Sequence, residues 1–305
     1  MQLFVHIGLH KTATTYLQVD VFPYLQGINY INGNDQALLP WKRRMYMQDP
    51  LVFDVERARD EILALTKEGK NLLSTEALSG SPMGQYLDRT LILQKLKAMF
   101  PDARVILGLR SQPDIIWSLY KNYVRKGGTC RLDQMTDPYG TSLGRDFIDL
   151  DSYKYGPYLD RISDLFGPEN LHILLFEELS IDRDRLLQRL LDFLGAELEG
   201  GITTDKRAVG ISDAAVPVIR AINNVVMARG RESPGTLRQI LRVSRAVDRA
   251  VTVLPGRDGV AADKQVLRPL PAYYLADNID IDARYGLGLA DHPLTRQKYL
   301  LKATT

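Results

Sequence analysis

A lysine and three threonines follow the first apolar run of the chain, where a strand is expected to give way to a helix. The segment reads Gly8-Leu9-His10-Lys11-Thr12-Ala13-Thr14-Thr15. The free N–H groups at a helix start, the helix dipole, the lysine and the hydroxyls would converge on one point, which suits an anion. Helix capping alone would explain one hydroxyl, but not three threonines and a lysine. The segment is not a Walker A motif, which requires Gly-x-x-x-x-Gly-Lys-Ser/Thr.

A second group of polar residues begins at Arg110, directly after the apolar run Val105-Ile106-Leu107-Gly108-Leu109. Open α/β sheets bind ligands at the carboxyl ends of their strands, and Arg110 lies at such an end. Ser118 follows eight residues later within the next expected helix. An arginine fork and a serine hydroxyl suit a phosphate, although Arg110 could instead cap a carbonyl or pair with a carboxylate. Two anion sites at neighbouring strand ends indicate a nucleotide with phosphates at two positions.

Short apolar runs alternate with longer helical patterns over the first 200 residues. Alternation of this kind predicts βαβ units and a mainly parallel sheet, and continuous apolar strands indicate that both faces are covered. We expect strands at Leu3–Ile7, Asn71–Ser74, Arg104–Leu109 and Leu171–Phe176. We expect helices at Thr14–Phe22, Val55–Lys67, Leu91–Phe100, Pro113–Lys126, Leu159–Phe166, Arg183–Leu194, Val216–Met227 and Leu237–Val251.

The organisation predicted is one domain, with an α/β nucleotide-binding core at 1–210 and a helical or loop-rich extension at 211–305. The 305 residues carry a net charge of +2, far from the basic excess that nucleic-acid binding usually requires. The single cysteine, Cys130, excludes an intrachain disulfide and fits a reducing compartment. The chain shows no secretory signal and no apolar run of the roughly 18 residues that a spanning helix needs. We expect a cytoplasmic protein with no integral membrane segment.

Together the two polar motifs resemble those of the PAPS-dependent sulfotransferase family, in its bacterial, carbohydrate-type branch. The family's 5′-phosphosulfate loop is similar to Gly8-x-x-Lys11-Thr12-x-Thr14-Thr15, although its usual glycine is Ala13 here. Its 3′-phosphate motif is similar to Arg110 followed by Pro113 and Ser118. The resemblance covers residues 1–210 and implies a P-loop-NTPase-like sheet.

The resemblance also implies a cofactor and a reaction. The donor would be 3′-phosphoadenosine 5′-phosphosulfate (PAPS), the product would be 3′,5′-diphosphoadenosine (PAP), and no metal would be required. Lys11 would stabilise the leaving phosphate while an acceptor hydroxyl or amine attacks sulfur in line. The 5′-phosphate would be held by the segment Thr12, Ala13, Thr14 and Thr15, and the 3′-phosphate by Arg110 and Ser118. Lys206 and Arg207 lie where many family members bring a late basic segment to the nucleotide.

A hydroxyl that attacks sulfur needs a general base. Glu76 follows the expected strand Asn71–Ser74 and resembles the catalytic glutamate of glycan-modifying members. His10 is the second candidate because it adjoins Lys11, and either residue could instead serve a structural role. The acceptor implied is a carbohydrate or another small molecule. The sequence does not indicate the oligomeric state of the protein.

Two other functions fit parts of the sequence. A P-loop kinase or NTPase is suggested by His172-Ile173-Leu174-Leu175-Phe176-Glu177-Glu178, which resembles a Walker B strand. That hypothesis requires a Walker A motif, which the first loop does not contain, and a magnesium-binding aspartate, which the strand lacks. A non-catalytic nucleotide-binding module is the other alternative, because the assignment of a general base depends on one glutamate.

Overall fold

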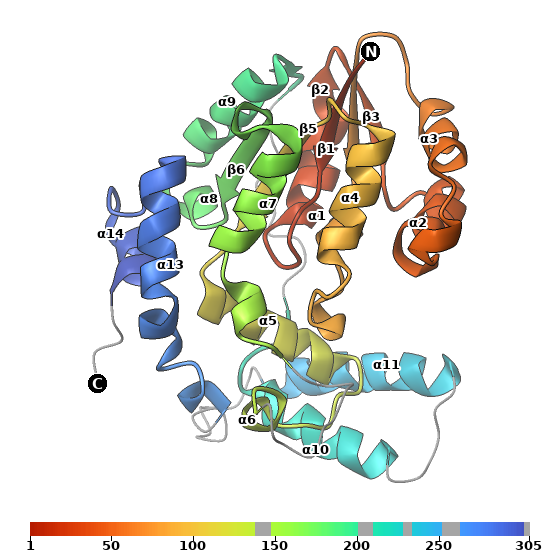
Figure 1. The fold of residues 1–305 in the computed structure, drawn as a ribbon. Coiled ribbons are helices and arrows are strands. Elements are labelled where there is room, and N and C mark those ends of the chain that lie inside the picture. Colours follow the sequence, from red (N-terminus) through yellow and green to blue (C-terminus); the bar gives the residue numbers. More distant parts are fainter. Residues whose placement is uncertain (138–147, 201–209, 228–233, 252–262, 302–305) are drawn as a thin grey trace.

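The centre of the molecule is a five-stranded parallel sheet with strand order β3–β4–β1–β5–β6 (Figure 1). The computed structural model describes residues 1–137, 148–200, 210–227, 234–251 and 263–301. The strands are β1 (Gln2–His6), β3 (Ile28–Asn32), β4 (Lys70–Ser74), β5 (Arg104–Leu109) and β6 (Leu171–Leu175). A short antiparallel pair joins β2 (Leu25–Gln26) to β7 (Glu197–Leu198). The predicted fold class, a central parallel sheet flanked by helices, is confirmed.

The helices surround this sheet. In chain order they are α1 (Thr14–Tyr16), α2 (Leu39–Met47), α3 (Val55–Leu63), α4 (Arg89–Met99), α5 (Gln112–Arg125), α6 (Leu132–Met135), α7 (Gly156–Phe166), α8 (Glu178–Ile181), α9 (Arg183–Leu194), α10 (Ala215–Met227), α11 (Pro234–Val251), α13 (Leu270–Tyr285) and α14 (Pro293–Thr295).

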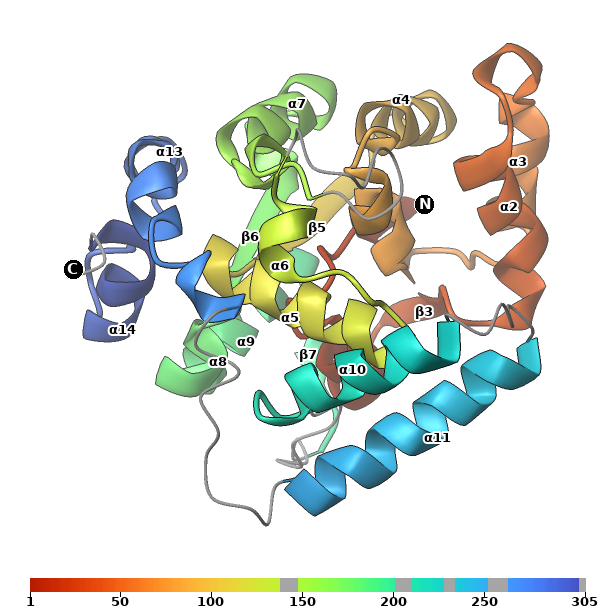
Figure 2. The ribbon, with the colours of Figure 1, turned by 90° about the horizontal axis from the view of Figure 1, so that it is seen from below.

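Both faces of the sheet are buried, which explains why its central strands are continuous apolar runs. Side chains alternate across a strand, so Val5 of β1 enters one hydrophobic cluster and Phe4 enters the other. The larger cluster includes Ile92 of α4 and Leu159 of α7, and the smaller cluster includes Leu190 of α9. Figures 1 and 2 show α4 and α7 on one side of the sheet and α9 on the other.

The strand order places a topological switch at β1. The chain continues from β1 to β3 and β4 on one side, and then crosses to β5 and β6 on the other side. In open α/β sheets, ligands bind outside the carboxyl ends of the strands at such a switch. The segments that follow β1, β4 and β5 therefore meet at one crevice, and these segments hold Lys11, Glu76 and Arg110.

The helical segment after β1 differs from the expected α-helix at Thr14–Phe22. Regular α-helix covers only Thr14–Tyr16, a π-helical turn follows at Leu17–Val21, and a 3₁₀ turn follows at Phe22–Tyr24. The widened turn carries Gln18, whose buried amide donates to Ser74 Oγ at 3.0 Å. A side-chain bond to the end of β4 thus accompanies the departure from α geometry, as is common for π-bulges near functional sites.

The described residues after 210 pack on the core mainly as helices. Helices α10 and α11 lie beside α5, as Figure 2 shows. Helix α13 packs against α5 and α7, and its Asn278 accepts a hydrogen bond from Gln112 at 2.6 Å. Among the residues described, no helix combines the length and apolarity needed to cross a bilayer.

Candidate active site

The turn after β1 has an unusual backbone. Gly8 has a φ of +44°, and a Cβ at this position would lie 2.5 Å from Thr14 Cγ2, so the turn requires glycine. Lys11 and Ala13 have φ values of +70° and +62°. The left-handed region costs a residue with a Cβ about 1–2 kcal/mol. Strain of this kind concentrates in ligand-binding segments, where the surrounding structure enforces it.

A cavity of about 400 Å³, hereafter the donor cavity, lies at the carboxyl ends of β1 and β5. Seven of the residues singled out from the sequence line it, which are Lys11, Ala13, Thr14, Thr15, Glu76, Arg110 and Ser118. The rest of its described lining is Tyr16, Lys121, Asn122, Arg125, Phe176, Gly210 and Ile211. Four cationic side chains and one carboxylate are in this lining, so the cavity has the charge expected of a site for a polyanion.

Arg110 is fixed on two sides. Its Nη1 donates to the main-chain carbonyl of Lys11 at 3.0 Å, and its guanidinium carbon lies 4.2 Å from the centroid of the Phe176 ring. Arg110 therefore does cap a carbonyl, which was one of the alternatives open from the sequence. Its Nε is nevertheless buried and has no hydrogen-bond partner among the described residues. Because this atom is fully buried, the parts of Arg110 that line the donor cavity are the ones available to a ligand.

Helix α5 contributes three polar residues that the sequence analysis missed. Lys121, Asn122 and Arg125 follow Ser118 at spacings of three, four and seven, so all four side chains lie on one face of the helix. Arg125 donates to the Asn122 side-chain oxygen at 2.8 Å. The helical spacing from Ser118 was the signal that could have identified this face.

Lys11 and Glu76 influence each other across the donor cavity. Burial raises the pKa of the half-buried Glu76 carboxyl, and the nearby Lys11 ammonium partly opposes this increase. Burial lowers the pKa of Lys11, and the charge of Glu76 opposes that decrease. Glu76 begins the 3₁₀ turn Glu76–Ser79, just after β4, and β4 pairs in parallel with β1. A carboxyl with a raised pKa and a lysine with a lowered pKa thus line the same cavity and interact electrostatically, which is common at functional sites.

A second cavity of about 530 Å³, hereafter the acceptor-side cavity, adjoins the donor cavity. Thr15 and Glu76 line both cavities. The other described lining residues are His10, Gln18, Asn34, Leu39, Lys42, Arg43, Tyr46, Met47, Thr75 and Ala77. A group held in either cavity therefore has the Glu76 carboxylate at its boundary.

His10 lies on the acceptor side of the loop. Its Nδ1 is 3.5 Å from Ser79 Oγ, and it lines the acceptor-side cavity rather than the donor cavity. Burial, followed by the positive charge of Lys11, lowers its pKa to about 4. His10 is therefore neutral near pH 7 and a weaker base than an ordinary histidine.

Thr12 lies below the loop instead of in the cavity lining. Its buried hydroxyl donates to the Leu9 carbonyl at 2.6 Å. It packs on Gly108, where an added Cβ would lie 2.7 Å from Thr12 Oγ1. In the structure Thr12 thus supports the shape of the loop. Lys206 and Arg207 lie outside the described residues.

Glu177, the first of the two glutamates in the segment resembling a Walker B strand, is engaged within the protein. It accepts hydrogen bonds from the Ser111 N–H at 3.1 Å and from the Tyr299 hydroxyl at 2.8 Å. It is buried and does not contribute to the described lining of the donor cavity. Its contacts connect β6, α5 and the C-terminal segment, which is a structural role.

Several solved structures resemble this chain at low sequence identity. A sulfotransferase from Alicyclobacillus acidocaldarius is 17% identical, with a TM-score of 0.49 over 78% of this chain and 99% of its own. The sulfotransferase domain of the curacin biosynthetic pathway is 15% identical, with a TM-score of 0.37 over 79% of this chain and 96% of its own. Mouse sulfotransferase SULT7A1 complexed with PAP is 13% identical, with a TM-score of 0.35 over 76% of this chain and 68% of its own.

Sequence comparison adds an independent finding. No curated protein matches the chain at a significant level. Residues 56–200, which include Glu76, Arg110 and Ser118, match the sequence model of the sulfotransferase family.

Proposed function

We propose that this protein is a sulfotransferase that moves a sulfuryl group from PAPS to a hydroxyl, or an amine, of a carbohydrate or another small molecule. The observation that carries the proposal is the position of Glu76 and Thr15 between two cavities, one of them lined by four cations. This arrangement suits a transfer reaction in which an anionic donor and an acceptor meet at one carboxylate. The family match at residues 56–200 supports the reaction class.

The residues of the donor cavity fit an adenosine bisphosphate. A volume of about 400 Å³ lies within the range of small-molecule sites. Arg110 and Ser118 both line this cavity, where they supply a charged and a neutral hydrogen-bond donor. We assign Arg110 and Ser118 to the 3′-phosphate, and Thr14, Thr15 and the loop around Ala13 to the 5′-phosphate. Lys206 and Arg207 stay further candidates for nucleotide contact.

The chemical step balances with the side chains present. The acceptor oxygen forms a bond to sulfur while the bond from sulfur to the phosphate oxygen of PAPS breaks. The acceptor proton goes to the Glu76 carboxylate, and the electron pair of the broken bond goes to the phosphate of PAP. Lys11 places its ammonium group where this negative charge develops, which is the main electrostatic contribution to the rate. His10 is the alternative proton acceptor.

Calorimetric titration of the protein with PAP in the absence of magnesium tests the donor assignment, with ATP as the control ligand. We expect PAP to bind and ATP to bind much more weakly. Tight ATP binding that requires magnesium would instead favour a kinase or NTPase. Turnover of PAPS with a hydroxylated acceptor then separates a transferase from a non-catalytic nucleotide-binding module.

A further inference from the structure

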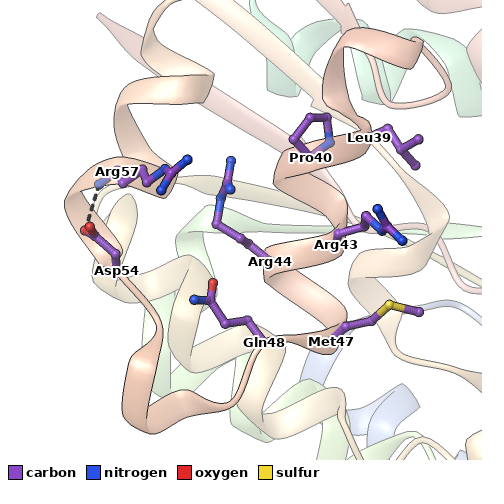
Figure 3. Close-up of a pocket in the computed structure, with 8 residues that line it drawn as sticks. All are labelled: Leu39, Pro40, Arg43, Arg44, Met47, Gln48, Asp54 and Arg57. Atoms are coloured by element: carbon purple, nitrogen blue, oxygen red, sulfur yellow. Dashed lines mark hydrogen bonds between the residues drawn. The ribbon is translucent and has the colours of Figure 1, made fainter.

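The acceptor-side cavity continues along helix α2 into a neighbouring cavity of about 490 Å³. The two cavities share Leu39, Arg43 and Met47, which are spaced four residues apart on α2 and therefore lie along one side of the helix. Figure 3 shows the Arg43 side chain on the same side of the helix as Leu39 and Met47, whereas Arg44 extends toward Arg57 of α3. Arg43 thus stands at the junction of the two cavities, which we call the α2 groove.

Arg43 differs from the other cations of the α2 groove in its contacts. Arg44 forms an ion pair with Glu61, and Arg57 lies 3.8 Å from the same carboxylate. Lys42 donates to the Gly33 carbonyl at 2.6 Å. Arg43 has no ion pair or hydrogen bond within the described part of the chain, and its side chain is exposed. Its guanidinium group is therefore available to a ligand without the loss of an existing contact.

Contacts at both ends of helix α2 fix the backbone from which Arg43 projects. The ammonium of the buried Lys95 donates to the carbonyls of Met45 at 3.1 Å and Gln48 at 2.9 Å, at the C-terminal end of α2. A cation at this end of a helix satisfies free carbonyls and complements the helix dipole. Trp41 and Met45 anchor the opposite side of α2 in the core. A side chain presented by such a rigid element is well suited to recognition.

The lining of the α2 groove is both apolar and basic. Leu39 and Met47 are 53% and 80% exposed, so they offer apolar surface on either side of the arginine. Apart from the Glu76 carboxylate, which we assign to the chemistry, Asp54 is the one acidic residue in the described lining, and it accepts from the Arg57 main-chain N–H at 3.0 Å. Among the described charged residues of this lining, Arg43 is thus the cation that has neither an ion pair nor a hydrogen bond.

We infer that the acceptor carries an oxyanion group, carboxylate or phosphate, and that Arg43 selects it by binding this group while the reactive hydroxyl lies at Glu76. This inference rests on the proposed function, because it assigns the acceptor of the same site. Leu39 and Met47 contact an apolar part of the same molecule. Arginine suits this role because its planar fork binds carboxylate and phosphate oxygens with two donors.

The test uses three matched probes, namely octyl β-D-glucopyranoside, the corresponding glucuronide and the corresponding 6-phosphate. Each is titrated calorimetrically, below its micellar concentration, into protein saturated with PAP, so that the cations of the donor cavity are already occupied. We expect at least one anionic probe to bind about tenfold or more tightly than the neutral one, as for a hydrogen bond to a charged group. The two anionic probes distinguish a carboxylate from a phosphate.

Arg43→Gln should abolish this preference without lowering the affinity for the neutral probe or for PAP. Arg59→Gln is the matched control, since it removes the same charge from neighbouring α3 at a residue that lines neither part of the α2 groove. Equal affinities for all three probes, or a preference that survives Arg43→Gln, would overturn the inference. Failure of PAP to bind would contradict the proposed function separately, and the same comparison of probes can then be made on the free protein.

Discussion

The guanidinium group of Arg110 donates to the main-chain carbonyl of Lys11 at 3.0 Å. This contact joins the turn after β1 to the end of β5, so the two segments that we assign to phosphate binding are not independent. Lys11 has a left-handed backbone with a φ of +70°, and the hydrogen bond helps to hold its carbonyl in that orientation. Arg110 therefore supports the loop in addition to the ligand-binding role that we propose for it.

The double role of Arg110 predicts unequal effects at the proposed 3′-phosphate site. Arg110→Ala removes a charged donor and the support of the loop, so we expect PAP affinity to fall about 10- to 100-fold. Ser118→Ala removes one neutral hydrogen bond, and we expect a loss of about 2- to 10-fold. Calorimetry with PAP measures both changes. Arg59→Ala serves as the control, and equal losses for the two variants would contradict a second role for Arg110.

Lys11→Ala should affect the reaction more than the binding of the product. We propose that its ammonium group stabilises the negative charge that develops on the leaving phosphate as the bond to sulfur breaks. We therefore expect kcat/KM to fall about 10²- to 10³-fold. PAP affinity should change much less. Steady-state kinetics with PAPS and calorimetry with PAP separate these effects. Lys97 lines neither cavity, so the control variant Lys97→Ala should leave both quantities unchanged. Normal turnover in the Lys11→Ala variant would show that Lys11 has no part in the mechanism.

Glu76→Gln should lower kcat about 10²- to 10⁴-fold, as for the loss of a general base, and leave PAP binding unchanged. The base must be deprotonated, so activity is lost as the pH falls through its pKa. Because burial raises the pKa of Glu76, the acidic limb of the pH–rate profile should lie above the ordinary glutamate value of 4.5. In Lys11→Ala this limb should move to still higher pH, since the lysine charge lowers the pKa of Glu76. A fully active Glu76→Gln variant would transfer the role to His10.

Ala13→Gly should stabilise the protein. Ala13 has a φ of +62°, and glycine adopts this conformation without the cost that a Cβ imposes, although the unfolded chain gains entropy. We expect a net gain of up to about 1 kcal/mol in the free energy of unfolding, measured by urea denaturation. PAP affinity should be unchanged. A destabilised variant would show that the backbone of the loop in solution differs from the one described.

We expect Asp213 to make a pH-dependent contribution to the free energy of unfolding. Burial acts to raise its pKa, but hydrogen bonds from Lys264, Trp117 and Lys121 outweigh burial and lower the pKa to about 2. A carboxyl with a lowered pKa stabilises the fold above its unfolded pKa, near 3.8, and loses that effect as the pH falls toward about 2. The side chain is 37% exposed, so we expect a contribution of only about 1 kcal/mol.

The variant Asp213→Asn checks this contribution. It should unfold at a lower temperature than the unaltered protein at pH 7, and the two melting curves should converge as the pH falls toward 2. Asp102→Asn, on the exposed turn after α4, is the control. A difference that stays constant over the whole pH range would show that Asp213 does not stabilise the fold through its charge.

The buried parts of the fold were predictable because burial leaves a continuous apolar pattern. Strands β1, β4, β5 and β6 were expected within a residue or two of their observed ends. Strand β3 was missed because Ile28–Asn32 is interrupted by Asn29 and ends in Asn32, so at this sheet edge its apolar run is short and partly exposed. Helix α13 was missed because its hydrophobic stripe is weak and its burial depends on contacts such as that between Asn278 and Gln112. Such contacts join segments that are far apart in the sequence.

The candidate site was predictable where motif residues follow a strand or, as for Ser118, belong to a motif that begins at a strand end. Lys11, Glu76 and Arg110 come directly after β1, β4 and β5, so the parallel sheet brings them together. The burial of Thr12 depends on the local path of the loop, which its residue type does not reveal. Arg125 lies two helical turns beyond Ser118 and joins the cavity through the orientation of α5, which depends on packing.

Among the residues that the structure describes, the donor cavity and the acceptor-side cavity share only Thr15 and Glu76. The donor cavity is built largely from the sheet edge and α5, whereas α2 supplies much of the acceptor-side lining. Substitutions along the outer side of α2 therefore leave the described donor lining intact. Under the proposed function, a chain with this division can exchange one acceptor for another during evolution by changes on a single surface helix, while the cavity assigned to the nucleotide is inherited unaltered.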